Sequence, residues 1–393
     1  MRLLFFGTYD ASAHPRVKVL RDGLAAHGAT VLECNVPLGL STASRVAMLA
    51  QPWRLPLLAA RLVRCWATLV VRSGRFRRGG DRTRGSWPDA VVVGYLGHFD
   101  VLLARRLFPH VPLVLDHLIG ASDTAADRGV GDGLRQRLLT RIDAAALSRA
   151  DLVVVDTEEH RDALPEEHRG RALVVPVGAP DDWFVSGPER EGDGPLRAVF
   201  FGLFTPLQGA PVIGAALARL AAAGWPAVEV TMVGRGQDLE QTRALAGLHA
   251  GVRWLDWAEP ADLPALVAEH DVCLGIFGTG AKALRVVPNK VFQGAAAGCA
   301  LVTSDTAPQR RVLGSLDDGG AAVLVPPGDD RALAEALHGL ATDRARLATA
   351  RAAAVELARR SFTPVAVTTG LHARLLATLP AEPPRVDAPR RPS

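Results

Sequence analysis

Three cationic residues lie close together in the second half of the sequence, Lys282, Arg285 and Lys290. Pro288 stands between them, and proline is favourable in the first turn of a helix. Cations at the positive end of a helix are unfavourable unless an anion balances them. We therefore expect a diphosphate to bind at the start of this helix, beside Pro288 and Asn289. A solvated basic loop is the alternative interpretation.

Two glycine-containing turns could bring backbone N–H groups close to the same phosphates. These turns, Phe200–Gly209 and Met232–Gly236, supply four candidate residues: Gly202, Thr205, Gln208 and Gly234. Either turn alone is a weak signal, because many connections between a strand and a helix contain glycine. The pattern G-x-G-x-x-G after the first strand is absent, which argues against an NAD-dependent dehydrogenase.

Short apolar runs alternate with helical patterns, as in parallel sheets that helices cover on both faces. In the first half of the chain, strands are expected at 3–6, 30–34, 90–93, 113–115, 152–155 and 173–175. In the second half they are expected at 198–201, 228–233, 252–255, 272–274, 300–303 and 322–325. The chain is therefore predicted to be an α/β protein with two doubly wound Rossmann-like domains that face each other across a cleft.

The domain boundaries follow from the same pattern. Residues 1–178 are expected to form the first domain, 179–196 a linker rich in Gly, Pro, Asp and Glu, and 197–361 the second domain. The long helical stretch 343–379 could close one domain or cross back, so that 362–378 complete the first domain. Residues 380–393 are rich in proline and charge and are predicted to be a disordered tail.

The composition is that of a folded protein, with 48% apolar and 22% charged residues. A net charge of +4 is too small to require a nucleic-acid partner. The four cysteines form no C-x-x-C pair, and we interpret them as buried apolar residues in a reducing cytoplasm. No run reaches the roughly 18 apolar residues that span a bilayer, and the first residues lack the features of a signal peptide. We expect a cytoplasmic protein, soluble or peripheral to a membrane.

The basic residues are unevenly distributed. Between Arg45 and Arg84 there are ten arginines and one acid, Asp81. In this segment apolar side chains recur at helical spacing, at Leu55, Leu58, Leu62, Trp66 and Leu69. One interpretation is an amphipathic helix packed on the first domain. The other is a basic face that lies on an anionic membrane or holds a lipid-linked acceptor.

In its alternation of strands and helices and in the segment around Pro288, Asn289 and Lys290, the chain resembles the retaining GT-B glycosyltransferases of the GT4-type family. The resemblance extends to about Leu376 and is strongest in 271–305, which is similar to the Pro-Asn-Lys variant of that family's donor-binding segment. It implies an N-terminal domain that binds the acceptor and a C-terminal domain that binds a nucleotide sugar.

The chain departs from the family at four positions. Arg285 and Gln293 occupy the places of two glutamates that usually hold the donor sugar and the ribose, and a glutamine amide can still bind hydroxyl groups. Leu203 and Gln208 occupy the places of an arginine and a lysine that often hold the diphosphate. We suggest that Lys282, Arg285 and Lys290 supply the missing positive charge.

In the N-terminal half, the first loop is similar to the family loop that approaches the reacting sugar. Its candidate residues are Gly7, Thr8, Tyr9, His14 and Arg16. His98 follows another strand, and Asp116 and His117 follow the next, so their side chains are expected at the cleft. For each histidine, a packing or surface position is the alternative. The loop residues Asp123, Thr124, Asp127 and Arg128 are candidates for acceptor contacts, or are solvated charges.

The resemblance implies transfer with retention at the anomeric carbon and without a protein nucleophile. Catalysis is then electrostatic stabilisation of the leaving diphosphate, for which we expect Arg285 and Lys290, together with His98. No Asp-x-Asp motif occurs, so no metal and no other cofactor is expected. The donor is expected to be a nucleotide-diphosphate sugar of the hexose type, with UDP favoured from the family alone. The acceptor would be a small molecule or lipid-linked.

Two alternatives keep the same fold. A non-catalytic GT-B scaffold or partner protein is suggested by the four departures. A nucleotide-sugar 2-epimerase is the other, and the missing glutamate at Arg285 argues against it.

Overall fold

The computed structural model describes residues 1–11, 14–40, 48, 52–76, 87–95, 97–118, 133–185, 187, 194–225, 228–247 and 251–378. Several sequence predictions fall outside these residues. They are the tail at 380–393, the loop residues Asp123, Thr124, Asp127 and Arg128, Asp81, and parts of the linker and of the segment Arg45–Arg84.

The first sheet has six parallel strands in the order β2-β1-β3-β4-β5-β6. Its strands are β1 (Arg2–Gly7), β2 (Thr30–Asn35), β3 (Ala90–Val93), β4 (Leu113–Asp116), β5 (Leu152–Val155) and β6 (Ala172–Val174). The central strands are apolar and buried along their whole length, because helices cover both faces of the sheet.

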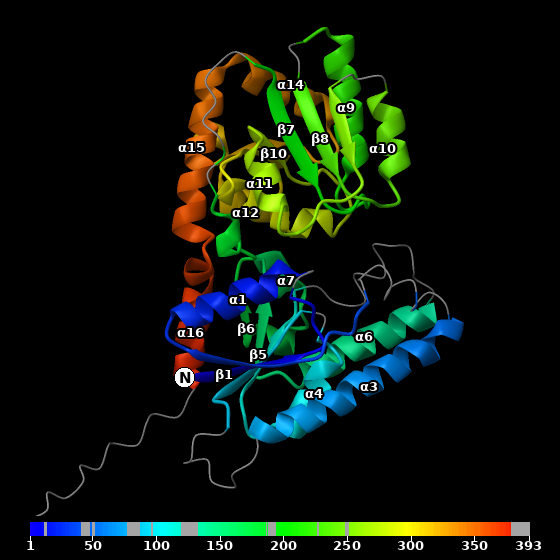
Figure 1. The fold of residues 1–393 in the computed structure, drawn as a ribbon, viewed down its shortest axis with the longest axis vertical. Coiled ribbons are helices and arrows are strands. Elements are labelled where there is room, and N and C mark those ends of the chain that lie inside the picture. The colour runs from blue at the N-terminus through cyan, green and yellow to red at the C-terminus, as the bar shows by residue number, and fades with distance from the viewer. Residues whose placement is uncertain are drawn as a thin grey trace, which may run out of the picture.

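Helices of this domain connect and cover those strands (Figure 1). They are α1 (Pro15–Ala26), α3 (Leu55–Ser73), α4 (Asp100–Leu107), α6 (Gly133–Leu147), α7 (Glu158–Ala163) and α8 (Glu166–Arg169), with short 3₁₀ turns η1 (Pro52–Arg54) and η2 (Gly74–Phe76). A further 3₁₀ turn, η4 (Asp181–Trp183), follows the first domain, and its Trp183 packs in an apolar cluster of the second domain. Among the described residues, no helix is both long and apolar enough to cross a membrane. Three cysteines are buried as predicted, whereas Cys65 on α3 is only half-buried.

The second sheet also has six parallel strands, in the order β12-β11-β10-β7-β8-β9. Its strands are β7 (Leu196–Phe201), β8 (Val228–Val233), β9 (Val252–Leu255), β10 (Val272–Leu274), β11 (Ala300–Ser304) and β12 (Ala322–Val325). All twelve predicted strands are present, with ends within two residues of those expected. The predicted fold class, two doubly wound parallel sheets, is confirmed.

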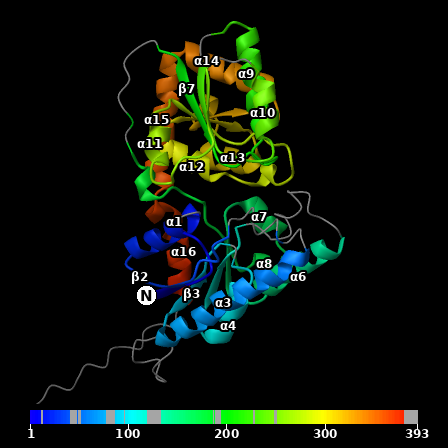
Figure 2. The same cartoon turned by 45° about the vertical axis from the view of Figure 1, so that its right-hand side comes forward.

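The helices of the second domain lie on both faces of its sheet (Figure 2). They are α9 (Ala210–Ala222), α10 (Leu239–Ala246), α11 (Leu263–Ala268), α12 (Asn289–Ala296), α13 (Ala307–Leu313), α14 (Asp330–Thr342) and α15 (Arg344–Ser361), with 3₁₀ turns η5 (Ala283–Arg285) and η6 (Leu316–Asp318). Pro288 precedes α12 as its cap with an extended backbone, so the first-turn position expected for it was wrong by one residue.

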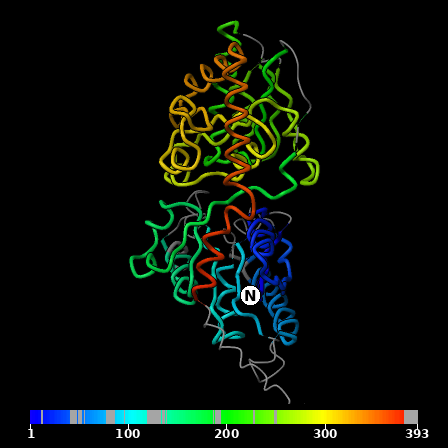
Figure 3. The backbone as a smooth tube through the Cα atoms, turned by 90° about the vertical axis from the view of Figure 1, so that its left-hand side faces the viewer, coloured from blue at the N-terminus to red at the C-terminus, as the bar shows by residue number. Residues whose placement is uncertain are grey.

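The last helix, α16 (Pro364–Thr378), lies on the first domain (Figures 1 and 3). Leu371 and Leu375 are buried in the same apolar cluster as Leu20 and Leu24 of α1. The two helices are so close that a Cβ at Gly23 of α1 would lie 2.1 Å from the carbonyl oxygen of Pro364. The absence of a side chain at position 23 therefore sets the distance between α1 and α16.

Replacing Gly23 by alanine is expected to destabilise the protein by about 1–3 kcal/mol, because the new methyl group forces α1 and α16 apart. Thermal unfolding followed by circular dichroism measures the loss, and hydrogen exchange of the α16 amides locates it. Gly370→Ala on α16 is the matched control, since a Cβ there meets nothing within 4 Å. Alanine favours a helix over glycine, so the control should be neutral or slightly stabilised. Equal stability of the two variants would contradict the close packing.

Candidate active site between the two domains

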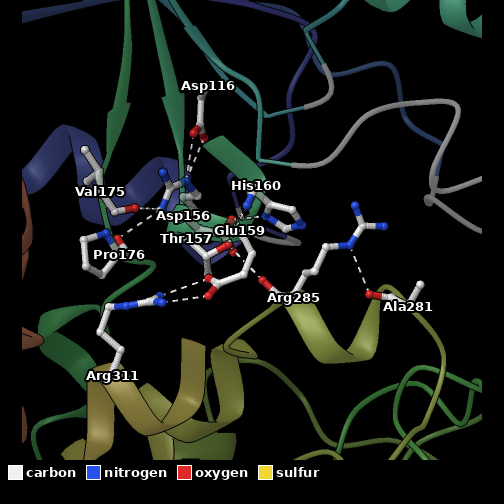
Figure 4. A network of polar contacts seen from close by, with 11 residues as sticks. Asp116, Asp156, Thr157, Glu159, His160, Val175, Pro176, Ala281, Arg285 and Arg311 are labelled. Carbon is white, nitrogen blue, oxygen red and sulfur yellow. Dashed lines mark hydrogen bonds and ion pairs between the residues drawn. The ribbon is translucent and has the colours of Figure 1, made fainter. Parts of the chain in front are cut away.

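The carboxyl ends of the two sheets are held against each other by a few direct contacts. The Thr157 hydroxyl, just after β5, donates to the carbonyl oxygen of Arg285 at 2.8 Å. Glu159 on α7 and Arg311 on α13 form a two-point ion pair, with N···O distances of 2.8 and 3.0 Å (Figure 4). Loops that follow the strands of both domains therefore meet, and in open α/β sheets this is where ligands bind. Sequence reasoning missed Thr157, Glu159 and Arg311, since nothing local marks them as partners, and it selected Arg285 for its positive charge and not for its carbonyl oxygen.

Lys290 is the most unusual charge in this region. Its side chain is only 4% exposed although it carries an ammonium group. Nζ donates to Gln208 Oε1 at 2.5 Å and lies 3.5 Å from the centroid of the Phe200 ring. A Cβ at Gly202 would lie 3.6 Å from the same nitrogen. The structure thus brings together three of the residues predicted from separate motifs, Lys290, Gln208 and Gly202.

Among the residues that the structure describes, no carboxylate contacts Lys290, so burial disfavours its charged form. Desolvation lowers the pKa of its ammonium to about 7, and the nearby Cys273 thiol opposes this only weakly. A glutamine oxygen and an aromatic face stabilise a cation less than an anion does. A bound anion at this place would therefore restore the ordinary charge of the lysine.

The glycines of the predicted turns allow three loops to stack closely. Gly234, with φ 135°, lies under the loop after β7, where a Cβ would approach the Gly202 carbonyl oxygen to 1.8 Å. Gly209 begins α9 in the left-handed region, with φ 64°, and its Cβ would meet the Gly278 nitrogen at 2.4 Å. Side chains at these positions would separate the loops, so the glycines position the backbone around Lys290.

The remaining donor-side candidates are distributed around this centre. Gln293 is buried on α12, Thr205, Lys282 and Pro288 are half-buried, and Asn289 is exposed. The predicted cluster of three cations is not reproduced as a single group. The Arg285 guanidinium donates through Nε to the Ala281 carbonyl at 3.0 Å within its own loop (Figure 4), whereas Lys290 points to Gln208.

On the N-terminal side, Thr8 binds a carboxylate that sequence reasoning did not select as a site residue, and Gly7 lies close to it. Asp100 Oδ2, at the start of α4, accepts from the Thr8 backbone nitrogen at 2.7 Å and from the Thr8 hydroxyl at 2.8 Å. A Cβ at Gly7 would lie 2.9 Å from the same oxygen. The first loop is therefore held in place by Asp100, and the Thr8 side chain serves this contact.

Two further acceptor-side candidates bind each other. Arg16 and Asp116 are both buried, and Arg16 Nε lies 2.8 and 3.1 Å from the two Asp116 oxygens. Arg16 Nη1 also donates to the carbonyl oxygens of Val175 and Pro176, each at 3.0 Å (Figure 4). Burial raises the pKa of Asp116, and the adjacent guanidinium opposes that rise. This pair ties α1 to the ends of β4 and β6.

Tyr9 and His14 also have partners within the domain. The buried Tyr9 hydroxyl donates to Glu33 Oε1 at 2.7 Å, and burial together with this carboxylate raises its pKa. The His14 ring lies edge-on to Tyr95, with 4.8 Å between centroids. Tyr9 therefore points to the neighbouring strand β2, which is a structural contact.

His98 and His117, which follow β3 and β4 in the sequence, lie against each other. Their rings lie edge-on with 5.1 Å between centroids, and both are buried. Burial lowers the pKa of each histidine, and that of His117 falls to about 3. Nε2 of His98 is 3.4 Å from Asp143 Oδ1. Both imidazoles are neutral near pH 7, which suits them to hydrogen-bond a neutral hydroxyl group.

A third histidine lies in the same region and was not selected from the sequence. His160 on α7 contacts Asp156 through Nδ1 at the end of β5 (Figure 4), and the charge of His160 contributes to the lowered pKa of His117. Within the described residues, no three histidine, cysteine or carboxylate side chains are arranged to hold a metal ion.

Comparisons with known proteins agree with this arrangement. Residues 195–343 match the profile of the family described as glycosyl transferases, group 1. A phosphatidyl-myo-inositol mannosyltransferase of Mycolicibacterium smegmatis is 34% identical over 179 residues, which are 44% of this chain and 43% of that protein. The enzyme of the same name from Mycobacterium leprae is 34% identical over 173 residues, 43% of this chain and 44% of that protein. The alignments thus span less than half the length of these curated relatives.

Solved structures match over nearly the whole chain. Sucrose-phosphate synthase from Thermosynechococcus elongatus superposes with a TM-score of 0.68 at 16% identity, covering 96% of this chain and 98% of that one. The Anabaena protein HepE, solved with UDP-glucose, gives a TM-score of 0.64 at 16% identity, covering 96% and 100%. At such identities the likeness establishes the fold. The chain therefore has the GT-B fold, and its segment 195–343 matches the group 1 glycosyl transferases.

Proposed function

We propose that this chain is a glycosyltransferase that moves a hexose-type sugar from a nucleotide-diphosphate sugar to an acceptor, with retention at the anomeric carbon. One observation carries the proposal: within the described part of the chain, Lys290 is buried without a carboxylate partner, and it reaches Gln208 and Gly202. In the family that the sequence resembles, a lysine for the diphosphate often stands where this chain has Gln208. Lys290 on α12 reaches Gln208, so it supplies the positive charge that position 208 lacks.

The proposed reaction places little chemical demand on the protein. The bond between the sugar and the diphosphate breaks, and negative charge grows on the leaving phosphate. The oxygen of the acceptor hydroxyl bonds to the anomeric carbon on the same face of the sugar, and the leaving phosphate accepts the proton of that hydroxyl. Lys290, the backbone N–H groups of the glycine turns and the start of α12 stabilise this charge. His98 and His117, neutral and buried, would hydrogen-bond sugar hydroxyls from the other domain.

The donor is assigned by analogy with relatives. HepE was solved with UDP-glucose, and the curated relatives are mannosyltransferases, which supports a hexose and a nucleoside diphosphate. UDP is our first choice, and no metal is assigned to the site. The rival interpretation, a non-catalytic GT-B scaffold, rests on the departures at Leu203, Gln208, Arg285 and Gln293. The buried lysine favours the enzyme, because an unbalanced buried cation is costly in a protein that binds no anion.

A thermal-shift panel in a buffer containing EDTA tests the donor. UDP, GDP, ADP, dTDP and CMP are compared, and one diphosphate is expected to raise the melting temperature above the others. A ligand at 100 times its Kd stabilises the native state by about 2.7 kcal/mol. Stabilisation in EDTA supports a site that needs no metal, whereas a shift that returns only with Mg²⁺ contradicts it. No response to any nucleotide would favour the scaffold.

Lys290→Met is expected to lower turnover by roughly 10²–10³-fold, because removing one group that stabilises the developing anion costs about 3–4 kcal/mol. Methionine keeps the buried chain length, and an unchanged melting temperature shows that the fold is intact. Arg285→Ala is the matched comparison. It keeps the carbonyl contact with Thr157 and removes only the guanidinium bound to Ala281, so a smaller loss is expected. Near-normal turnover in Lys290→Met would remove our assignment of the diphosphate site.

The lowered pKa of Lys290 predicts a pH dependence of nucleotide binding. The free protein loses the lysine proton above pH of about 7, while a diphosphate binds the protonated form. Affinity should therefore fall by up to about tenfold per pH unit between pH 7 and 9, where the phosphates are already ionised. Calorimetry in buffers of different ionisation enthalpy should detect uptake of a proton. The same dependence in Lys290→Met would assign it to another group.

A further inference from the structure

Helix α3 presents apolar side chains on both of its sides. One side packs on the domain: Leu69 is fully buried, and Trp66 donates through Nε1 to Asp100 Oδ1 at 2.9 Å. The interpretation of 55–69 as a packed amphipathic helix is therefore correct for this side. Leu55 is outside the set of side chains that the structure describes. Figures 1 and 2 show α3 on the outside of the domain, beside α4.

The opposite side of α3 faces outward and is also apolar. Leu57 and Val71 are 51% and 79% exposed, and Trp53, in the turn η1 that leads into the helix, is 74% exposed. Ala60 and Ala67 are exposed between them. Residues 57, 60, 64, 67 and 71 follow the three- and four-residue spacing of one helix face. We call Trp53, Leu57, Ala60, Ala67 and Val71 the outer stripe.

Arginines accompany the outer stripe. Residues 52–76 contain five arginines and no acid. Arg72 and Arg75 donate to the carbonyl oxygens of Asn35 and Glu33, at 3.0 and 2.9 Å, and so lie against β2. Arg54, Arg61 and Arg64 remain exposed on the outer part of the helix. The surface therefore combines large apolar side chains with exposed arginines.

Among possible binding partners, a membrane surface fits these apolar and arginine side chains best. A helix lying in a membrane interface buries apolar side chains below the headgroups and places cations at the level of the lipid phosphates. We propose that α3 docks this protein on an anionic membrane, with Trp53, Leu57 and Val71 inserted and Arg61 and Arg64 on the phosphates. The proposal rests on the proposed function, since it places the acceptor in or at that membrane.

Flotation with lipid vesicles tests the docking. The full chain is mixed with vesicles of 30% phosphatidylglycerol in phosphatidylcholine, or of phosphatidylcholine alone, at low and high salt. Binding is expected to the anionic vesicles and to weaken at high salt. Arg61→Gln/Arg64→Gln should lower the partition coefficient roughly 25-fold, about fivefold for each arginine. Trp53→Ser/Val71→Ser should abolish the binding that survives high salt.

A matched control removes two exposed arginines from the C-terminal domain, Arg253→Gln/Arg360→Gln, and should bind as the unchanged protein does. The nucleotide-induced thermal shift is measured on every variant, so that failure of the donor site and failure of the docking surface are separate results. Wild-type protein that stays unbound, or arginine variants that float normally, would overturn the proposal. A dimer in light scattering that Trp53→Ser/Val71→Ser dissociates would assign the outer stripe to a second copy instead.

Discussion

The candidate site depends on one unfavourable arrangement, an ammonium group buried between a glutamine oxygen and an aromatic ring. Lys290 cannot leave this place, because it is anchored on a helix whose residues 290–296 are buried. Its charge is therefore unstable in the empty protein and stable beside an anion. The fold has positioned a cation for which the residues described in the structure supply no counter-ion. The free protein therefore already bears part of the free-energy cost of holding a cation where an anion can bind.

The parallel sheet is what makes this geometry possible. In the second domain β7 lies between β8 and β10, so the loops after these strands leave the sheet at one edge. Gly202, Gly234 and Gly278 allow the loops to touch backbone to backbone, and the helix that follows β10 then delivers Lys290 to Gln208. In the first domain, contacts of other residues likewise fix the segments that follow the strand ends. There Asp100 holds the first loop, and the Arg16–Asp116 pair holds α1 to the strand ends.

The sequence was sufficient to predict the strands, and it selected three residues that the structure brings together. Both the correct predictions and the missed contacts have physical reasons. Fully apolar runs such as Ala90–Val93 and Val272–Leu274 can only be buried strands in so regular an alternation with helices. Gly202 and Gln208 were selected because they lie in the turn after a strand, and Lys290 because it lies with two other cations at the expected start of a helix. Spacing along the chain could not show that Arg285 binds its own loop, nor that Arg16 and Asp116, 100 residues apart, satisfy each other. Directions of side chains depend on packing partners, and these are distant in sequence.

The return of α16 to the first domain has a consequence for how the chain is made. The polypeptide passes between the domains twice, and the two passages touch, since Ala179 N donates to the Phe362 carbonyl at 2.9 Å. The second domain is one continuous segment and can fold while synthesis is still under way. The first domain must wait with the apolar face of α1 uncovered until its closing helix emerges. The part of the protein that the ribosome produces first is thus the part that is completed last.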